Sequence, residues 1–112
     1  MFVLEIAERD VVVLYPGRVL GKENLRDIRQ LLEDCERRGK RRFVLDFSKT
    51  EHVYYRLADL LAHHKNKLSA ENGSLVLAGV SPYLKDIFTA VGYGDAFEEY
   101  DNLAEAVHEA NC

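Results

Sequence analysis

Histidine and cysteine are the residues of this chain whose spacing could most readily reveal a catalytic or metal site. The four histidines are His52, His63, His64 and His108. His63 and His64 are adjacent, so they point to different faces of a helix and cannot form the i, i+4 pair of a helical metal site. His64 lies on an apolar helical stripe, which favours a core histidine over a ligand. Because CxxC, HExxH, GxSxG and phosphate-binding glycine motifs are also missing from the sequence, it predicts no catalytic residue, no metal and no cofactor.

Two charged features could bind a ligand, and each has a structural alternative. Asp46 ends a buried strand, where α/β proteins often place ligand-binding residues, but a carboxylate there can instead cap the following turn. The segment RRGKRR, residues 37–42, carries five positive charges in six positions. It could be an anion or partner site, or a solvated helix end that the helix dipole favours. No aromatic residues interleave with these charges, so the segment does not predict nucleic-acid binding.

The start of the second expected helix carries the least ordinary residues of the chain. Tyr54, Tyr55 and Arg56 stand where serine or aspartate usually caps a helix. A tyrosine hydroxyl is too distant to cap, so we expect a cost of about 0.5–2 kcal/mol. Arg56 opposes the helix dipole at a further cost of about 0.3–1 kcal/mol, which Asp59 partly offsets. A segment that breaks local rules in this way is where function should be sought.

Two roles are open for these residues. Tyrosine and arginine are enriched in interface hot spots, so Tyr54, Tyr55, Arg56 and Asp59 could form a partner-binding surface. Arg56 beside free helix N–H groups could also hold a carboxylate or phosphate. In the structural alternative, one tyrosine packs under the sheet edge and the other lies along the surface. We expect at least one of the two to be exposed, and aromatic residues there could also form a two-fold contact in a homodimer.

Length and composition restrict the class of protein. The 112 residues suit a single domain, 1–112, and 47% of them are apolar. The net charge of −4 predicts no general affinity for nucleic acid. No apolar run approaches about 18 residues, so no membrane span is expected. The N-terminus lacks a signal-peptide pattern, and Cys35 and Cys112 read as free thiols, which together favour a cytoplasmic protein.

Hydrophobic patterns predict alternating strands and helices. Strands are expected at 2–7, 11–16, 42–47 and 74–80, with a short one near 96–97, and helices at 22–38, 57–68, 82–91 and 101–110. Gly39 and Gly92 suit helix ends, Ser81 with Pro82 suits a helix start, and Asn102 with Glu105 is spaced as a capping box. The strands at 42–47 and 74–80 enclose a helix long enough for a right-handed parallel crossover. The sequence therefore predicts an α/β fold with a central mixed sheet of four or five strands and about four helices.

Three segments in this order resemble a STAS domain (sulfate transporter and anti-sigma factor antagonist). They are LYPGRVLGKENLRDIRQLLEDC (14–35), RRFVLDFSKTEHV (41–53) and GSLVLAGVSPYLKDIFTAVGYGDAFEEYDNLAEAV (73–107). The resemblance covers nearly the whole chain and implies a sheet with helices mainly on one side. It also implies partner binding rather than catalysis.

The resemblance places Tyr55 where bacterial anti-sigma factor antagonists carry a serine phosphorylated by their anti-sigma factor. The family's Asp-Ser-Ser-Gly turn is replaced here by Tyr54-Tyr55-Arg56-Leu57, and its acidic Gly-Glu-Leu-Asp segment by 17–20, Gly-Arg-Val-Leu. We therefore expect no serine phosphorylation at this turn. The resemblance implies a bacterial, non-enzymatic regulatory module that takes part in signalling and the regulation of transcription. Its partner would be an anti-sigma factor or other regulator. The alternative is a small-ligand or lipid-binding carrier or sensor domain on the same fold.

Overall fold

A five-stranded mixed sheet forms the centre of the computed structural model, which describes residues 2–6 and 10–111. The strands lie in the order β1-β2-β4-β6-β7, and only the β1–β2 pair is antiparallel. Their bounds are β1 Phe2–Ile6, β2 Val11–Tyr15, β4 Arg42–Asp46, β6 Ser74–Ala78 and β7 Glu99–Tyr100. The predicted α/β fold and the predicted parallel crossover between β4 and β6 are confirmed.

A second, two-stranded parallel sheet was not predicted. It pairs β3 (Val19–Leu20) with β5 (His52–Val53). The predicted strand at 96–97 is wrong in position, because β7 forms three residues later, where Glu99 pairs with Leu77. Phe97 is instead a core residue, 5.9 Å from Phe88 between ring centroids.

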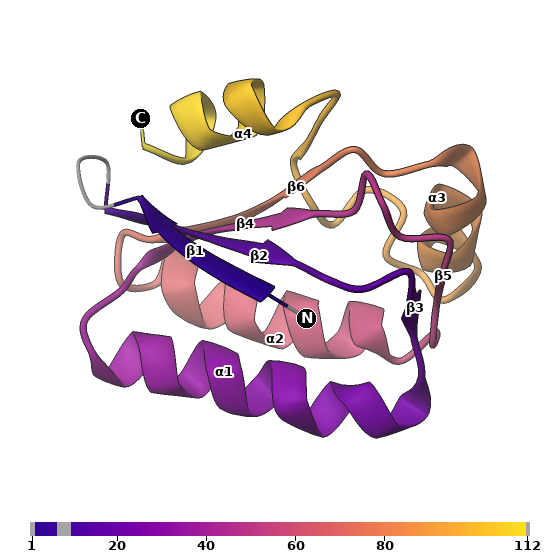
Figure 1. The fold of residues 1–112 in the computed structure, drawn as a ribbon, viewed down its shortest axis with the longest axis horizontal. Coiled ribbons are helices and arrows are strands. Elements are labelled where there is room, and N and C mark those ends of the chain that lie inside the picture. The colour runs from indigo at the N-terminus through magenta and orange to yellow at the C-terminus, as the bar shows by residue number, and fades with distance from the viewer. Residues whose placement is uncertain (1, 7–9, 112) are drawn as a thin grey trace.

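Four helices in the described part of the chain pack around the sheet (Figure 1). A short 3₁₀ turn, η1 (Lys22–Asn24), leads into α1 (Leu25–Arg37), which lies beside α2 (Leu57–Ser69) beneath one face. The last helix, α4 (Leu103–Ala110), lies over the opposite face, and α3 (Pro82–Ala90) lies near the carboxyl ends of β4 and β6. The expectation that the helices lie mainly on one side is confirmed, because α1, α2 and α3 pack into one core whereas α4 covers the other face.

Alternation along the strands supplies a core to each face. In β2, Val12 and Leu14 join the larger core under α1 and α2, whereas Val11 and Val13 join the smaller one under α4. All four are at most 1% exposed. Strands buried on both faces explain the nearly continuous apolar runs in the sequence. Among the described residues, no helix is long and apolar enough to cross a membrane.

Side-chain and glycine caps define three helix ends as predicted. Ser81 Oγ accepts from the Leu84 N–H at 3.2 Å, with Pro82 in the first turn, and Asn102 Oδ1 accepts from the Glu105 N–H at 2.9 Å. Gly39 follows α1 with a φ of +86°, in the left-handed region that glycine adopts most easily.

One charged residue of α1 lies on the core side of the helix. Glu36 is buried at 7% exposure, next to Cys35 on the core side of the helix. Its carboxylate meets His64 of α2, which confirms His64 as a core histidine with a satisfied ring. Cys35 is a free, buried thiol as predicted, while Cys112 lies outside the described residues.

Candidate functional site

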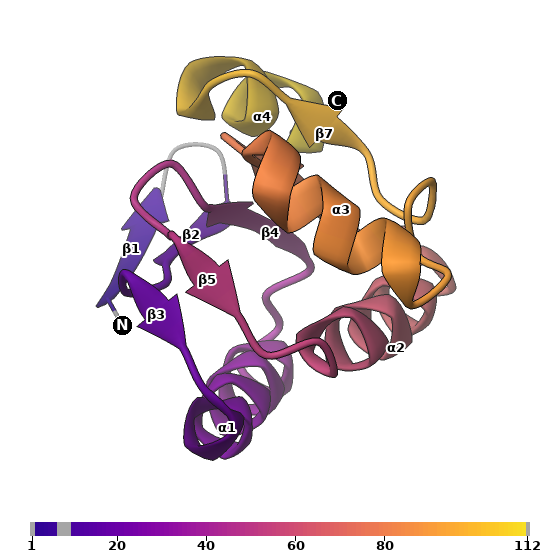
Figure 2. The ribbon, with the colours of Figure 1, turned by 90° about the vertical axis from the view of Figure 1, so that its right-hand side faces the viewer.

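The turn that carries Tyr54, Tyr55 and Arg56 lies at one end of the molecule, between β5 and the start of α2 (Figure 2). Backbone bonds from a distant segment hold it there. Tyr54 N–H donates to the Leu20 carbonyl at 2.7 Å, and Glu51 N–H donates to the Arg18 carbonyl at 2.7 Å. The two-stranded sheet thus fixes the turn against residues more than thirty positions earlier in the chain.

Helix α2 begins without a side-chain cap, as predicted. Arg56 is its N-cap residue, with φ −73° and ψ −6°, and the Arg56 side chain makes no capping hydrogen bond. This right-handed helical conformation differs from the extended backbone of an ordinary capping residue. The Leu57 N–H donates instead to the Tyr54 carbonyl at 3.0 Å, and the Leu57 and Ala58 side chains are fully buried. Backbone bonding and core packing hold this helix start in place of a cap.

The two tyrosines and the arginine form one compact surface group. The Tyr54 and Tyr55 ring centroids are 4.8 Å apart, and the Arg56 guanidinium carbon lies 5.6 Å from the centroid of the Tyr55 ring. Tyr55 is 46% exposed and Tyr54 is half-buried, so at least one tyrosine is exposed as expected. A guanidinium over an aromatic face is favourable, which restrains both side chains.

Hydrogen bonds shift the pKa values of two tyrosines in opposite directions. The guanidinium of Arg56, and next the hydroxyl of Tyr54, lower the pKa of the Tyr55 hydroxyl. A hydrogen bond with the Asp59 carboxylate raises the pKa of Tyr93, which lies in the loop after α3. Asp59, the fourth predicted site residue, lies in the first turn of α2.

A groove of about 280 Å³ adjoins this group, between α1 and α2. Its lining residues are Leu25 and Arg29 of α1, together with Arg56, Asp59, Leu60 and His63 from the start and first turns of α2. The α2 residues of this lining are spaced three or four positions apart and so share one helix face. This spacing is a sequence signal that could have placed His63 beside Arg56. Arg29 was missed because the packing of α1 against α2 alone brings it here.

Exposed apolar and aromatic side chains surround the turn. Val19 of β3 and Tyr83 of α3 are each 53% exposed. The Tyr83 hydroxyl lies 2.9 Å from Nδ1 of His52, the residue paired with Val19 across the small sheet. Three of the four large exposed apolar side chains in the described part of the chain, counting Tyr55, therefore occur at this end, and Leu4 is the fourth.

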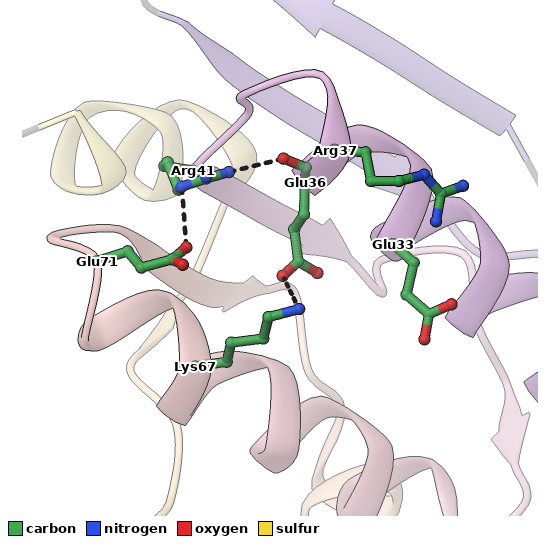
Figure 3. Close-up of a pocket in the computed structure, with 6 residues that line it drawn as sticks. All are labelled: Glu33, Glu36, Arg37, Arg41, Lys67 and Glu71. Carbon is green, nitrogen blue, oxygen red and sulfur yellow. Dashed lines mark hydrogen bonds and ion pairs between the residues drawn. The ribbon is translucent and has the colours of Figure 1, made fainter.

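A second cavity, of about 270 Å³, lies at the opposite end of α1 and α2 (Figure 3). Its charges are largely matched within the chain. Arg41 pairs with Glu71 at 2.9 Å and donates to the Glu36 carbonyl at 2.8 Å, and Arg37 pairs with Asp34. For residues 37–42, this pairing favours the helix-end interpretation over an anion site.

Asp46 also has a structural partner. Its Oδ1 accepts from the Ser48 N–H at 3.0 Å, and its side chain is buried. The carboxylate therefore caps the turn that follows β4, which is the structural alternative left open by the sequence.

A family model and solved structures can be compared with this architecture. The model of the STAS domain matches residues 3–110. Comparison with curated proteins gave no match. A proposed anti-sigma factor antagonist from Thermotoga maritima has a TM-score of 0.85 and 19% identity, over 98% of this chain and 93% of its own.

Two further solved structures share the fold at similarly low identity. The unphosphorylated anti-sigma factor antagonist SpoIIAA, from Bacillus, has a TM-score of 0.81 and 19% identity, over 96% of this chain and 93% of its own. A sulfate transporter family protein from Wolinella succinogenes has a TM-score of 0.75 and 16% identity, over 90% of this chain and 84% of its own. At these identities the structures establish the fold, while the family model spans nearly every residue. The chain belongs to the STAS domain family.

Proposed function

We propose that this chain is a non-enzymatic regulatory module that binds a protein partner through Tyr54, Tyr55, Arg56 and Asp59. The observation that carries the proposal is the exposed Tyr55 ring with Arg56 against it, on a turn held by backbone bonds to β3. Tyrosine and arginine contribute strongly to interfaces. A turn that is already ordered loses little entropy on binding.

Similar proteins support a role in partner binding. Among structures of this fold are the anti-sigma factor antagonist SpoIIAA and a chain of the stressosome, described as a signal integration and transduction hub. By this analogy the partner is an anti-sigma factor or another regulator. Because tyrosine replaces serine at position 55, we propose that serine phosphorylation of this turn is not the switch.

Site-specific photo-crosslinking in a lysate of the native host tests the proposal. A benzophenone amino acid placed at position 55 should yield a discrete crosslinked protein. The same group at Leu4 is a matched control, because Leu4 and Tyr55 are both 46% exposed. The crosslink at 55 should disappear when excess unlabelled wild-type chain is added, and Arg56→Ala chain should compete poorly. Equal products at 4 and 55 would sink the proposal.

The carrier alternative has less support from the site. The groove beside the turn is lined by Arg29, Arg56, Asp59 and His63, which do not suit a lipid tail. A thermal-shift screen separates the two functions, since a small ligand that raises Tm by several degrees would favour the carrier.

A further inference from the structure

We infer that the groove between α1 and α2 receives an acidic side chain from the protein partner, with Arg29 and Arg56 as the groups that bind its carboxylate. This inference rests on the proposed function and adds the chemistry of the partner. The groove adjoins the exposed turn, because Arg56 belongs to both.

Within the described residues, the arginines of the groove lack the ion pairs that three other arginines form. Arg18 pairs with Glu51 at 2.5 Å, Arg41 with Glu71 at 2.9 Å, and Arg37 with Asp34. Within residues 2–6 and 10–111, no carboxylate forms an ion pair with Arg29 or Arg56. Arg56 interacts with the neutral rings of Tyr55 and Tyr54. The two guanidinium groups therefore remain available to an anion from outside.

The groove lining holds a single carboxylate, that of Asp59. This carboxylate also raises the pKa of the Tyr93 hydroxyl, in the loop after α3. Two arginines and a histidine face this one carboxylate in a chain whose net charge is −4. The groove is therefore locally positive although the chain as a whole is negative. This positive charge favours a partner whose contacting surface is acidic.

The size and lining of the groove indicate what part of the partner enters. Its volume of about 280 Å³ is below the range of about 300–1,000 Å³ typical of pockets for whole small molecules. Leu25 and Leu60 add apolar surface beside the charges. A glutamate or aspartate next to an aliphatic or aromatic residue on a protein segment fits this combination, because guanidinium groups bind carboxylates bidentately while the leucines pack the neighbour.

A peptide titration tests this inference without knowledge of the natural partner. The probe is a blocked Asp-Leu-Glu-Glu-Phe peptide added to ¹⁵N-labelled chain and followed by NMR. We expect shifts of the backbone amides of Leu25, Arg29, Arg56, Leu60 and His63. Arg29→Glu and Arg56→Glu should each weaken binding by about tenfold, equivalent to about 1.4 kcal/mol. Arg26→Glu is the matched control, since it makes the same charge change at an exposed α1 position outside the groove lining.

Several outcomes would overturn the inference. They are no shifts at millimolar peptide, equal affinity for the Asn-Leu-Gln-Gln-Phe analogue, or equal weakening by Arg26→Glu. Inorganic phosphate that binds the groove as tightly as the peptide would assign a free-anion site instead. Co-sedimentation with phosphatidylglycerol vesicles that depends on Arg29 would assign a membrane surface. Arg29 and Arg56 are both exposed, so neither substitution should disturb the core. Arg29→Gln controls for misfolding caused by the charge reversal in Arg29→Glu, and we expect about a tenfold loss of affinity for it as well.

The peptide and crosslinking experiments test the acidic partner and the proposed function independently of each other. A crosslink at Tyr55 without binding of the acidic peptide leaves the proposed function standing and removes the acidic partner. Binding of the peptide without any crosslinked protein removes the proposed regulatory interface while the groove remains an acidic-peptide site.

Discussion

The imidazole of His64 and the carboxylate of Glu36 form a buried pair that links α2 to α1, with 2.8 Å between Nδ1 and Oε2. Their side chains are 3% and 6% exposed. Lys67 Nζ lies 3.3 Å from the other Glu36 oxygen, close enough for an ion pair but not aligned as a hydrogen bond. The two helices that line the groove are thus also joined by a contact between the middle of α2 and the last turn of α1.

Removing one member of this pair should destabilise the fold more than removing both. His64→Leu leaves the buried Glu36 carboxylate with only Lys67, and we expect a loss of about 3–5 kcal/mol in the free energy of unfolding. The double variant with Glu36→Leu as well should lose less, because no buried charge is left unpaired. Urea unfolding of both single variants and the double variant measures the coupling, and strictly additive losses would contradict the pairing.

The aromatic packing under α3 should be among the costliest features to remove. Phe88 is fully buried, with the Phe47 and Phe97 ring centroids 6.2 and 5.9 Å away. Phe88→Ala should lower the free energy of unfolding by about 3–5 kcal/mol through lost burial and a residual cavity. Tyr83→Ala, on the exposed side of the same helix, is the control and should change it by less than about 1 kcal/mol. Similar losses for the two variants would argue against this placement of α3.

Gly79 should tolerate no side chain. Its φ is +66°, and a Cβ there would lie 3.0 Å from the backbone of Ser48. Gly79→Ala should therefore destabilise the chain by about 1–3 kcal/mol. Gly17→Ala is the comparison, because a Cβ at position 17 meets nothing within 4 Å. Thermal unfolding should show a clearly lower Tm for the first variant only, and equal Tm values would refute the close approach.

Two tyrosines should titrate on opposite sides of their ordinary pKa of about 10. Arg56 lowers the pKa of Tyr55, so Arg56→Gln should raise it; Asp59 raises the pKa of Tyr93, so Asp59→Asn should lower it. The Tyr93 contribution to stability is complete below its unfolded pKa and is lost as pH rises through the higher folded value. The Tyr55 contribution to stability is complete above its unfolded pKa and is lost as pH falls through the lower folded value. Ring-carbon NMR in ¹³C-tyrosine-labelled chain resolves both titrations, and parallel shifts would contradict the assignment.

Self-association through the aromatic turn remains a prediction. If Tyr55 forms a two-fold contact, sedimentation at micromolar concentration should show a dimer that Tyr55→Ala converts to monomer, while Leu4→Ala leaves it unchanged. A monomeric wild-type chain at those concentrations would dismiss this contact.

Long, patterned elements could be predicted from the sequence because their signals are local. The β-branched runs gave β1, β2, β4 and β6, and the apolar stripes with Ser81, Gly39 and Asn102 gave the helices and their ends. Strands β3 and β5 have two residues each, which is too few to show the two-residue alternation of a strand. The position of β7 was misread because Phe97 looks like a strand residue yet packs into the core.

The residues of the candidate site also differ in whether a local sequence signal marks them. The sequence drew attention to Tyr54, Tyr55, Arg56 and Asp59 through the missing cap, which is a local irregularity. Arg29 and the burial of Glu36 depend on contacts between α1 and α2 across 27 or more positions, since Glu36 meets His64 at a separation of 28. Only the folded packing of the two helices reveals such neighbours.

The pairing of β3 with β5 makes the exposed turn a property of the folded chain alone. The Leu20 carbonyl that holds Tyr54 is 34 positions away, so a short peptide copying residues 51–61 lacks the bond that shapes the surface. A partner that recognises this surface would bind the native state and not the unfolded state, and mass action would then raise the Tm of the whole chain. For such a partner, binding and folding would be linked: a chain that lost its structure would also lose its partner, without any separate signal.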